Sequence, residues 1–444
     1  MKITNNKIDR QPRNSANHKK WEKKAVLCCF LLFFYFPILA QPVATRDSVK
    51  MDSSVAGNLS HLQNQQKNSF IHQLGIELRP GIVLKTNDFL RGNTVDGKKY
   101  NNFFSAHLKY SFQFKPNTVA DRVFRGTYQG IGLNYYDFGN QQKLGTPVSV
   151  YLFQGGQIAR LNPKLTFNYE WNFGLSWNWK HYDTTTNPEN SVIGSKANAY
   201  IDAAFYFKWL ASRYIDVVAG LDFTHFSNGN TQIPNAGLNL LNLKLGLIYN
   251  FNREEDKQNT SAVDVSVPEF KKHITYDFVA FGSWRRKGVM YGDKKIASPF
   301  KYNVWGFNVS ALYNLCYRFR TGLSLDGIYD MSAGVTTDDK IVSTGDDPKP
   351  RYLNPPWNKQ LALGVSARGE FVMPYFAINF GIGVNVLHGN SDLESLYEIL
   401  ALKTDITSNL YLHIGYTLQN FHSPNYLMFG IGLRFNNRVA KIYR

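Results

Sequence analysis

The residues whose types and spacing best suit a chemical reaction lie in one short segment, His225-Phe226-Ser227-Asn228-Gly229. In an extended strand, His225 and Ser227 project from the same face with Cα atoms roughly 7 Å apart, so the imidazole can turn toward the hydroxyl. A histidine in that position supplies the base that a serine nucleophile needs. At the strand end, the backbone N–H groups of Asn228 and Gly229 leave the ladder and could bind an oxyanion. The pattern indicates acyl-transfer chemistry.

The elements that must position these residues are strands, because the chain alternates apolar and polar residues from Phe70 onward. Sixteen alternating segments start near residues 70, 101, 127, 147, 164, 195, 214, 239, 273, 302, 317, 360, 375, 397, 409 and 425. Segments of this kind, separated by turn residues, are typical of a transmembrane β-barrel. No apolar run is long enough for a membrane-spanning helix. The sequence therefore predicts an all-β, antiparallel outer-membrane barrel.

The alternation also predicts which side chains face the membrane. In the seventh segment, Leu221 and its odd-numbered neighbours are apolar, whereas Asp222 lies on the other face. Because a charge cannot face hydrocarbon cheaply, the odd-numbered residues face lipid. His225 and Ser227 continue this lipid-facing series, and Asn239 begins the same series in the next segment. The three polar side chains thus converge at the rim of the outer wall.

Loop lengths place that rim on the external side. If the first strand rises from the periplasm, loops after odd-numbered strands are long and those after even-numbered strands are short. Long polar loops follow odd-numbered strands at 86–100, 184–194, 286–301 and 331–359. Short turns follow even-numbered strands at 161–163, 211–213 and 373–374. One turn, near 117–126, is longer than this rule expects.

An internal repeat divides the chain. The seventh and eighth segments (IDVVAGLDFTHFSN and LNLKLGLIYNF) are similar to the fifteenth and sixteenth (LYLHIGYTLQNFHS and YLMFGIGLRF), with Gly220 matching Gly415. Each half supplies about eight strands, the minimum for a closed barrel. We expect two tandem barrel units, over 70–252 and 272–444, joined by a polar linker at 253–271. A single sixteen-stranded barrel is the alternative.

The second half lacks the chemical cluster. In the repeat alignment, Asn420 replaces His225 and His422 replaces Ser227, so no nucleophile remains. We therefore expect the second unit to have no catalytic site.

The N-terminus has the form of an export signal. Residues 1–24 are basic, residues 25–40 are apolar, and polar residues follow. This order predicts a secretory signal peptide over 1–40 and a flexible periplasmic lead-in over 41–69, with a membrane anchor as the alternative. Removal of the signal would lower the formal charge from +17 to +11, because that segment holds eight Lys or Arg and two Asp or Glu. Cys316 would be the one remaining cysteine, which allows no intrachain disulfide.

The segment HFSNGN…NAGLN, followed by an alternating strand, resembles the outer-membrane lipid A 3-O-deacylases, the PagL-type family. The resemblance implies an eight-stranded barrel with a His-x-Ser-Asn motif on its lipid-facing surface and an acidic residue on the next strand. It makes His225 the general base, Ser227 the nucleophile, and Asn228 with Gly229 the oxyanion donors. The acidic residue of the family falls on Asn239, which is a departure from the pattern.

The departure at Asn239 affects the mechanism. An asparagine carbonyl can accept a hydrogen bond from the imidazole Nδ1–H and hold its tautomer, but it cannot stabilise the imidazolium by charge. Two hypotheses follow. The first is a serine esterase, a lipid A deacylase and carboxylic ester hydrolase, that removes an acyl chain, expected to be the 3-O chain, from lipopolysaccharide. The second is a non-catalytic outer-membrane barrel, a porin or a structural or adhesion protein, with a decayed deacylase motif. In that case the functional residues would be the lumen residues Asp216, Asp222 and Lys244.

The expected partners follow from the same observations. No metal-ligand spacing, Walker loop or dinucleotide fingerprint occurs, so we expect no cofactor and no metal. No Lys/Arg cluster resembles a nucleic-acid stripe, so we expect no nucleic acid. The expected partner is lipid A, or whole lipopolysaccharide, in the outer leaflet of the bacterial outer membrane. A homodimer is compatible with the sequence.

Overall fold

The computed structural model of the chain describes residues 70–439 except 117, 252, 254–266, 292–293, 339–349, 395 and 422. The predicted signal peptide, the lead-in and most of the linker therefore lie outside the described residues. Within the described part, no helix has the length and apolarity to cross a bilayer.

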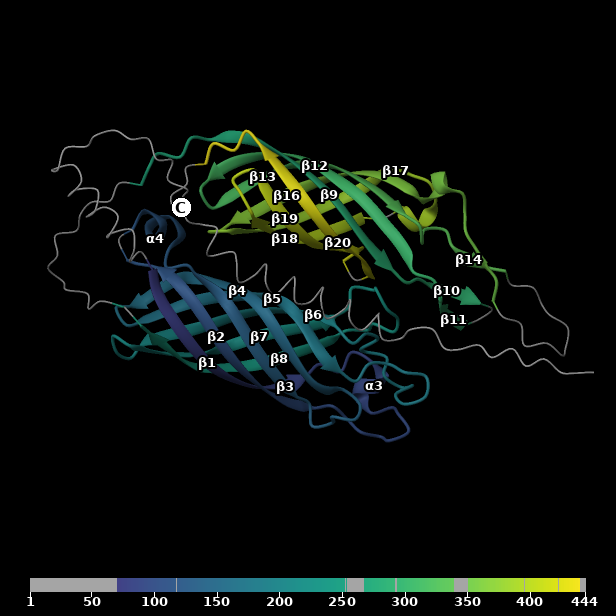
Figure 1. Cartoon of the computed structure of the whole chain (residues 1–444), viewed down its shortest axis with the longest axis horizontal. Coiled ribbons are helices and arrows are strands. Elements are labelled where there is room, and N and C mark those ends of the chain that lie inside the picture. Colours follow the sequence, from purple (N-terminus) through teal and green to yellow (C-terminus); the bar gives the residue numbers. More distant parts are fainter. Residues whose placement is uncertain are drawn as a thin grey trace, which may run out of the picture. The chain divides into compact units, whose positions relative to one another are not determined.

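The first half of the chain forms a closed antiparallel barrel of eight strands, drawn in purple to teal in Figure 1. Its strands are β1 (Phe70–Val83), β2 (Asn102–Phe114), β3 (Tyr128–Asp137), β4 (Gly145–Asn162), β5 (Leu165–Trp179), β6 (Asn198–Leu210), β7 (Ile215–Ser227) and β8 (Leu238–Asn250). Each strand pairs with the next along the chain, and β8 pairs with β1 to close the sheet.

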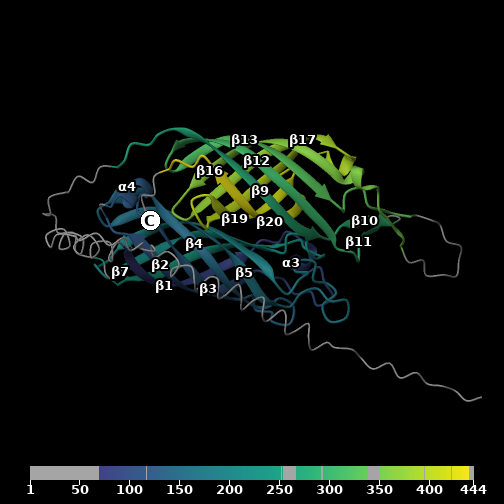
Figure 2. The same ribbon diagram turned by 45° about the horizontal axis from the view of Figure 1, so that its top comes forward.

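The second half forms another closed barrel of eight strands, drawn in green to yellow in Figure 2. Its strands are β9 (His273–Arg285), β12 (Tyr302–Cys316), β13 (Phe319–Asp330), β16 (Leu361–Val372), β17 (Phe376–His388), β18 (Leu396–Asp405), β19 (Leu410–Gln419) and β20 (Ser423–Phe435). Here β20 pairs with β9. The prediction of two tandem barrels is confirmed, and the single sixteen-stranded barrel is wrong. All sixteen predicted strands exist and begin within three residues of the predicted starts.

The loops carry the remaining elements. They are α3 (Asp88–Arg91), α4 (Val119–Phe124), the two-stranded sheets of β10 (Gly288–Tyr291) with β11 (Lys294–Ala297) and of β14 (Thr336–Thr337) with β15 (Tyr352–Leu353), and the 3-10 helices η1 (Trp357–Gln360) and η2 (Ser391–Leu393). The helix α4 accounts for the turn that was longer than expected. Thr118 caps it by accepting a hydrogen bond from the Asp121 N–H at 3.1 Å, and Val123 and Phe124 are buried.

The predicted faces of the strands are confirmed in both barrels. On β7, Leu221 is 57% exposed whereas Asp222 is 2% exposed. On β20, Ile431 is 55% exposed whereas Arg434 is 3% exposed. The outer wall is therefore apolar, as contact with lipid requires, and the polar side chains face the lumen.

Buried ion pairs fill the lumen of the first barrel. The Glu170 carboxylate accepts hydrogen bonds from Lys109 at 2.5 Å, from Lys244 at 2.8 Å and from the Tyr128 hydroxyl at 2.7 Å. Arg79, which is fully buried, pairs with Glu77 at 2.6 Å and with Asp202 and Asp222 at 3.3 and 3.2 Å. The network joins strands across the barrel, so it ties opposite walls of the sheet together.

The lumen of the second barrel has a network of the same kind. Asp277 accepts hydrogen bonds from Arg434 and Lys403, each at 3.0 Å, and Glu370 pairs with Arg320 at 2.5 Å. All of these side chains are buried. Because a buried charge is tolerated only when it is paired, these networks constrain how each barrel closes.

The central carboxylate of the first lumen gives a stability prediction. Glu170→Ala would leave two buried lysines with a single remaining carboxylate partner, and we expect it to lower the free energy of unfolding by about 3–5 kcal/mol. Urea unfolding in detergent micelles, followed by tryptophan fluorescence, measures this change. The matched control is Glu189→Ala, because Glu189 is a partly exposed loop residue paired with Lys143 at 3.6 Å. Its removal should cost no more than about 1 kcal/mol. Equal losses in the two variants would contradict the role assigned to the network.

Candidate active site on the outer wall

The strands β7 and β8 bring His225 and Asn239 together. The two residues are direct partners across the strand pair, and the His225 Nδ1 lies 2.6 Å from the Asn239 Oδ1. A carbonyl oxygen can only accept, so the Nδ1 of the neutral ring carries the proton and donates it. This tautomer leaves the Nε2 of His225 unprotonated, which is the form that a general base requires.

Ser227 lies two residues beyond His225 on the same outward series. Its Oγ accepts hydrogen bonds from the Asn235 side-chain amide at 3.0 Å and from the Gly229 backbone N–H at 3.1 Å. Among the described residues, no hydrogen bond joins His225 to Ser227. The hydroxyl is instead directed toward the loop between β7 and β8. Proton transfer from Ser227 to His225 would require the serine side chain to turn toward the imidazole.

The two predicted oxyanion donors differ in what they contact. The Gly229 N–H points at the Ser227 Oγ, and its φ of +62° is one that glycine adopts without strain. The Asn228 N–H instead donates to the Asn235 Oδ1 at 3.1 Å. The Asn228 side chain stabilises the loop by donating to the Gln232 carbonyl at 3.0 Å. Of the two backbone donors, only that of Gly229 is directed at the serine oxygen.

Asn235 contacts Ser227, although the sequence predicted no role for it. Its amide nitrogen donates to the Ser227 Oγ and its carbonyl oxygen accepts from the Asn228 N–H. One side chain thus bridges the serine and the backbone that follows it. Asn235 is the first residue of the NAGLN stretch. It lies in a loop, however, and the alternation that places strand residues on a face does not place loop residues.

The surroundings of the site are apolar. On β6, Ala199 is the partner of Ser227 and Ile201 is the partner of His225. Below the site, Phe223 on β7 and Leu241 on β8 are 44% and 39% exposed on the same wall. The polar cluster therefore sits directly above a surface suited to alkyl chains.

A second serine–histidine pair occurs in the lumen of the first barrel. Ser105 Oγ lies 3.2 Å from His107 Nε2, and His107 Nδ1 lies 3.0 Å from the Tyr151 hydroxyl. Ser105 is 0% exposed and His107 is 2% exposed, so no substrate reaches them. This pair is part of the packing of the lumen.

The second barrel offers no comparable cluster in its described residues. Asn420 lies in the turn after β19 with a φ of +54°, and His422 lies outside the described residues. In η2, Asp392 accepts hydrogen bonds from Lys287 and from the Gly334 N–H. Burial alone would raise the pKa of the Asp392 carboxyl, but these hydrogen bonds hold it below its usual value.

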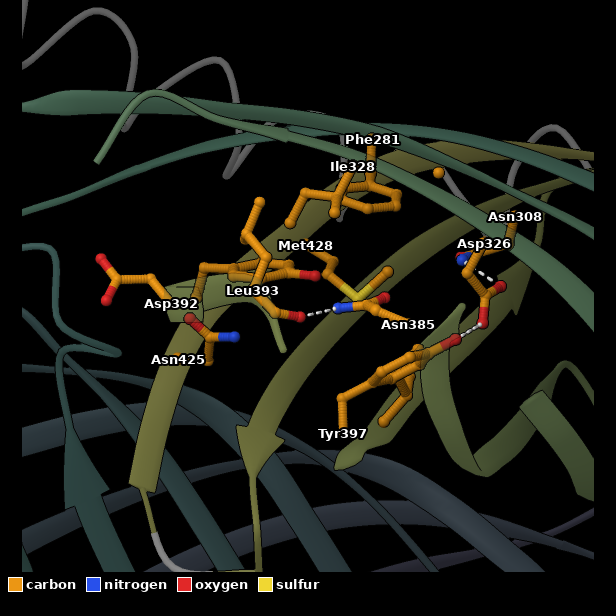
Figure 3. A pocket seen from close by; sticks show the side chains of 13 residues that line it. Phe281, Asn308, Asp326, Ile328, Asn385, Asp392, Leu393, Tyr397, Asn425 and Met428 are labelled. Carbon is orange, nitrogen blue, oxygen red and sulfur yellow. Dashed lines mark hydrogen bonds between the residues drawn. The ribbon is translucent and has the colours of Figure 1, made fainter. Parts of the chain in front are cut away.

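The mouth of the second barrel contains a small pocket (Figure 3). Asp326, Asn385, Tyr397 and Met428 are among the residues that line it, and the Tyr397 hydroxyl donates to Asp326 at 2.8 Å. Its volume of about 20 Å³ has room for about one water molecule. An acyl ester does not fit there. In the described part of the chain, no group of three or more His, Cys, Asp or Glu is arranged to hold a metal ion.

Fold and site together define a class: a β-barrel membrane protein with a His–Asn pair and a serine on its lipid-facing wall. Residues 101–247 match the profile of the lipid A 3-O-deacylase (PagL) family, and residues 274–437 match that of the acyloxyacyl hydrolase C-terminal domain. Together the two matches cover more than half of the chain. The chain belongs to the PagL-type family of lipid A deacylases, and it is located in the bacterial outer membrane.

Three solved structures are among those that match parts of this chain. The outer membrane enzyme PagL is 16% identical, with 39% of this chain and 97% of that chain covered and a TM-score of 0.26. Neisserial surface protein A is 9% identical, with coverages of 41% and 97% and a TM-score of 0.25. Omp33 of Acinetobacter baumannii is 9% identical, with coverages of 82% and 98% and a TM-score of 0.16. No curated protein sequence matches the chain.

Proposed function

We propose that the chain is an outer-membrane serine esterase that removes the ester-linked acyl chain at the 3-O position of lipid A. The observation that carries the proposal is the His225–Asn239 hydrogen bond of 2.6 Å beside Ser227 on the lipid-facing wall. Family membership supports lipid A as the substrate. A substrate that is itself a membrane lipid reaches such a site laterally, without passing through the lumen.

In the proposed mechanism, the Ser227 hydroxyl turns to the His225 Nε2 and its Oγ attacks the ester carbonyl. The imidazole takes the proton, and the carbonyl oxygen becomes an oxyanion. Collapse of this intermediate breaks the bond to the sugar oxygen, which receives the proton from His225 and leaves as a hydroxyl. Water activated by His225 then attacks the acyl-enzyme, and the fatty acid departs.

The groups proposed to stabilise the oxyanion are the Gly229 N–H and the Asn235 side-chain amide. Both now donate to the Ser227 Oγ, at 3.1 and 3.0 Å, so both lie beside the oxygen that would bond to the ester carbon. When the serine oxygen bonds to carbon, these donors can shift to the new oxyanion. The Asn228 N–H donates to the Asn235 Oδ1, so we propose that Asn228 shapes the loop. Its role as an oxyanion donor stays a prediction.

The proposed role of Asn239 is to hold the tautomer of His225. The amide accepts from Nδ1–H but carries no charge, so the imidazolium formed in the transition state is stabilised less than it would be beside a carboxylate. We therefore propose a slow esterase.

The packing of the lumen favours the esterase over the porin. The three lumen residues that a pore would use are all engaged: Asp216 pairs with Arg253 at 2.7 Å, Asp222 with Arg79, and Lys244 with Glu170. All three are at most 2% exposed. A lumen closed by such pairs leaves no wide path for ions.

Removal of the nucleophile tests the proposal directly. In cells that express Ser227→Ala, lipid A should keep the acyl chain that wild type removes, because about three or more orders of magnitude in rate are lost with a serine nucleophile. Mass spectrometry of lipid A reads both the loss and the position of the chain. Ser391→Ala in the second barrel is the matched control and should behave as wild type. Identical lipid A from wild type and Ser227→Ala would refute the proposal.

A carboxylate at position 239 should accelerate the reaction. Asn239→Asp keeps the shape of the acceptor and adds the charge that stabilises the imidazolium, so we expect kcat to rise by about 10- to 100-fold. Hydrolysis of a p-nitrophenyl acyl ester by the purified protein in detergent micelles measures it. Asn239→Leu, which removes the acceptor, should lower kcat. An unchanged kcat in both variants would show that this residue does not orient the base.

Planar-bilayer recordings test the porin alternative. Because the lumens are filled with paired charges, the purified protein should show no stable open channel. A steady, voltage-independent conductance would support a pore and count against a closed lumen.

A further inference from the structure

The loop between β5 and β6, residues 180–197, packs against the loop that carries Asn235. The Ser191 carbonyl accepts a hydrogen bond from the Ala236 N–H at 3.1 Å, and the Val192 carbonyl accepts one from the Gly237 N–H at 3.3 Å. These two bonds fix the backbone immediately after Asn235. The residue that contacts Ser227 is therefore held from a different part of the chain.

A buried asparagine makes the segment that carries the Ser191 and Val192 carbonyls rigid. Asn190 is 0% exposed, and its Oδ1 accepts hydrogen bonds from the Val192 and Ile193 N–H groups, each at 3.0 Å. Its Nδ2 donates to the Lys180 carbonyl at 2.8 Å. A side chain that uses both ends of its amide fixes the turn in which Ser191 and Val192 present their carbonyls.

Gly194 allows the two loops to approach. A Cβ at this position would lie 2.2 Å from the Pro234 carbonyl oxygen, which is far inside van der Waals contact. Any side chain at 194 must push Pro234 away, and Asn235 is the next residue. Gly237 lies directly against His225, since a Cβ at this position would be 2.9 Å from the His225 Cε1.

We propose that residues 190–194 form a brace that positions Asn235 against Ser227 and Gly237 against His225. Gly194 is a positioning residue of the active site, acting through Asn235. The barrel does not need this contact in order to close, because β5, β6, β7 and β8 pair along their lengths without it. The inference deepens the proposed esterase function and rests on it for its kinetic consequences.

The kinetic test is a double-mutant cycle on the purified full chain in detergent micelles, with a p-nitrophenyl acyl ester as the substrate. Displacement of Asn235 by about 1 Å should lower kcat by about 10- to 100-fold in Gly194→Ala, with little change in KM. Asn235→Ala should show a loss of similar size. If Gly194 acts through Asn235, the double variant should lose no more than Asn235→Ala alone. Losses that multiply, or a wild-type kcat in Gly194→Ala, would overturn the inference.

The matched control is Gly75→Ala in β1 of the same barrel. A Cβ there would meet its nearest neighbour at 3.7 Å, an ordinary contact, so kcat should stay at the wild-type value. Retention of the heat-modifiable band on gels shows that each variant keeps its barrel.

An NMR measurement tests the brace independently of activity. In wild type, Ser227→Ala should shift the side-chain amide resonances of Asn235, because it removes the acceptor at 3.0 Å. In a Gly194→Ala background the same substitution should shift them little. A full shift in that background would overturn the brace even if the wild-type protein hydrolyses no ester. A wild type without esterase activity that nevertheless shows the expected shifts would refute the proposed function and leave the brace standing.

Discussion

Closure of each sheet on itself is the constraint on which the other features of the structure depend. In hydrocarbon, an unpaired backbone N–H or C=O costs several kcal/mol, so a strand can cross the membrane only with partners on both sides. The pairing of β8 with β1 supplies the last of these partners in the first barrel. In the closed sheet, the register of β7 against β8 makes His225 and Asn239 direct partners. The backbone hydrogen bonds that strands need in the membrane thus also bring together the histidine and the asparagine of the proposed site.

Closure also separates the two kinds of polar chemistry in the molecule. Side chains that face the lumen form buried ion pairs, as Glu170 does with Lys109 and Lys244. These pairs fill the lumen and are part of its packing. The lumen pair Ser105–His107 illustrates the consequence, because it has the hydrogen bond of a catalytic dyad but no access for substrate. A reactive serine has to stand on the outward series, near the rim, where hydrocarbon gives way to polar groups. Ser227 occupies such a position.

The sequence predicts the strands and the site's wall well because both follow from local rules. Alternation with period two located all sixteen strands, and it placed His225, Ser227 and Asn239 on one face. It did not locate α4, whose capping residue Thr118 lies in a stretch without periodicity. Nor did it predict the contacts of Asn235, since they depend on Ser191 and Val192, more than 40 residues earlier in the chain. Loops that are positioned by distant backbone groups leave no periodic trace in a single sequence.

The comparison of the two barrels shows how little of the fold is needed to define the chemistry. The strand pair β19–β20 repeats β7–β8 in alternation and in pairing with a closing neighbour, yet its rim carries Asn420 in a left-handed turn where β7 carries His225. The alternation is under the constraint of the bilayer in both halves, whereas the rim residues are not. A few substitutions at the rim would therefore suffice to remove the proposed site without affecting closure. By the same argument, the proposed brace at 190–194 concerns the site alone, and its loss is expected to lower the proposed activity of the first barrel while leaving its walls intact.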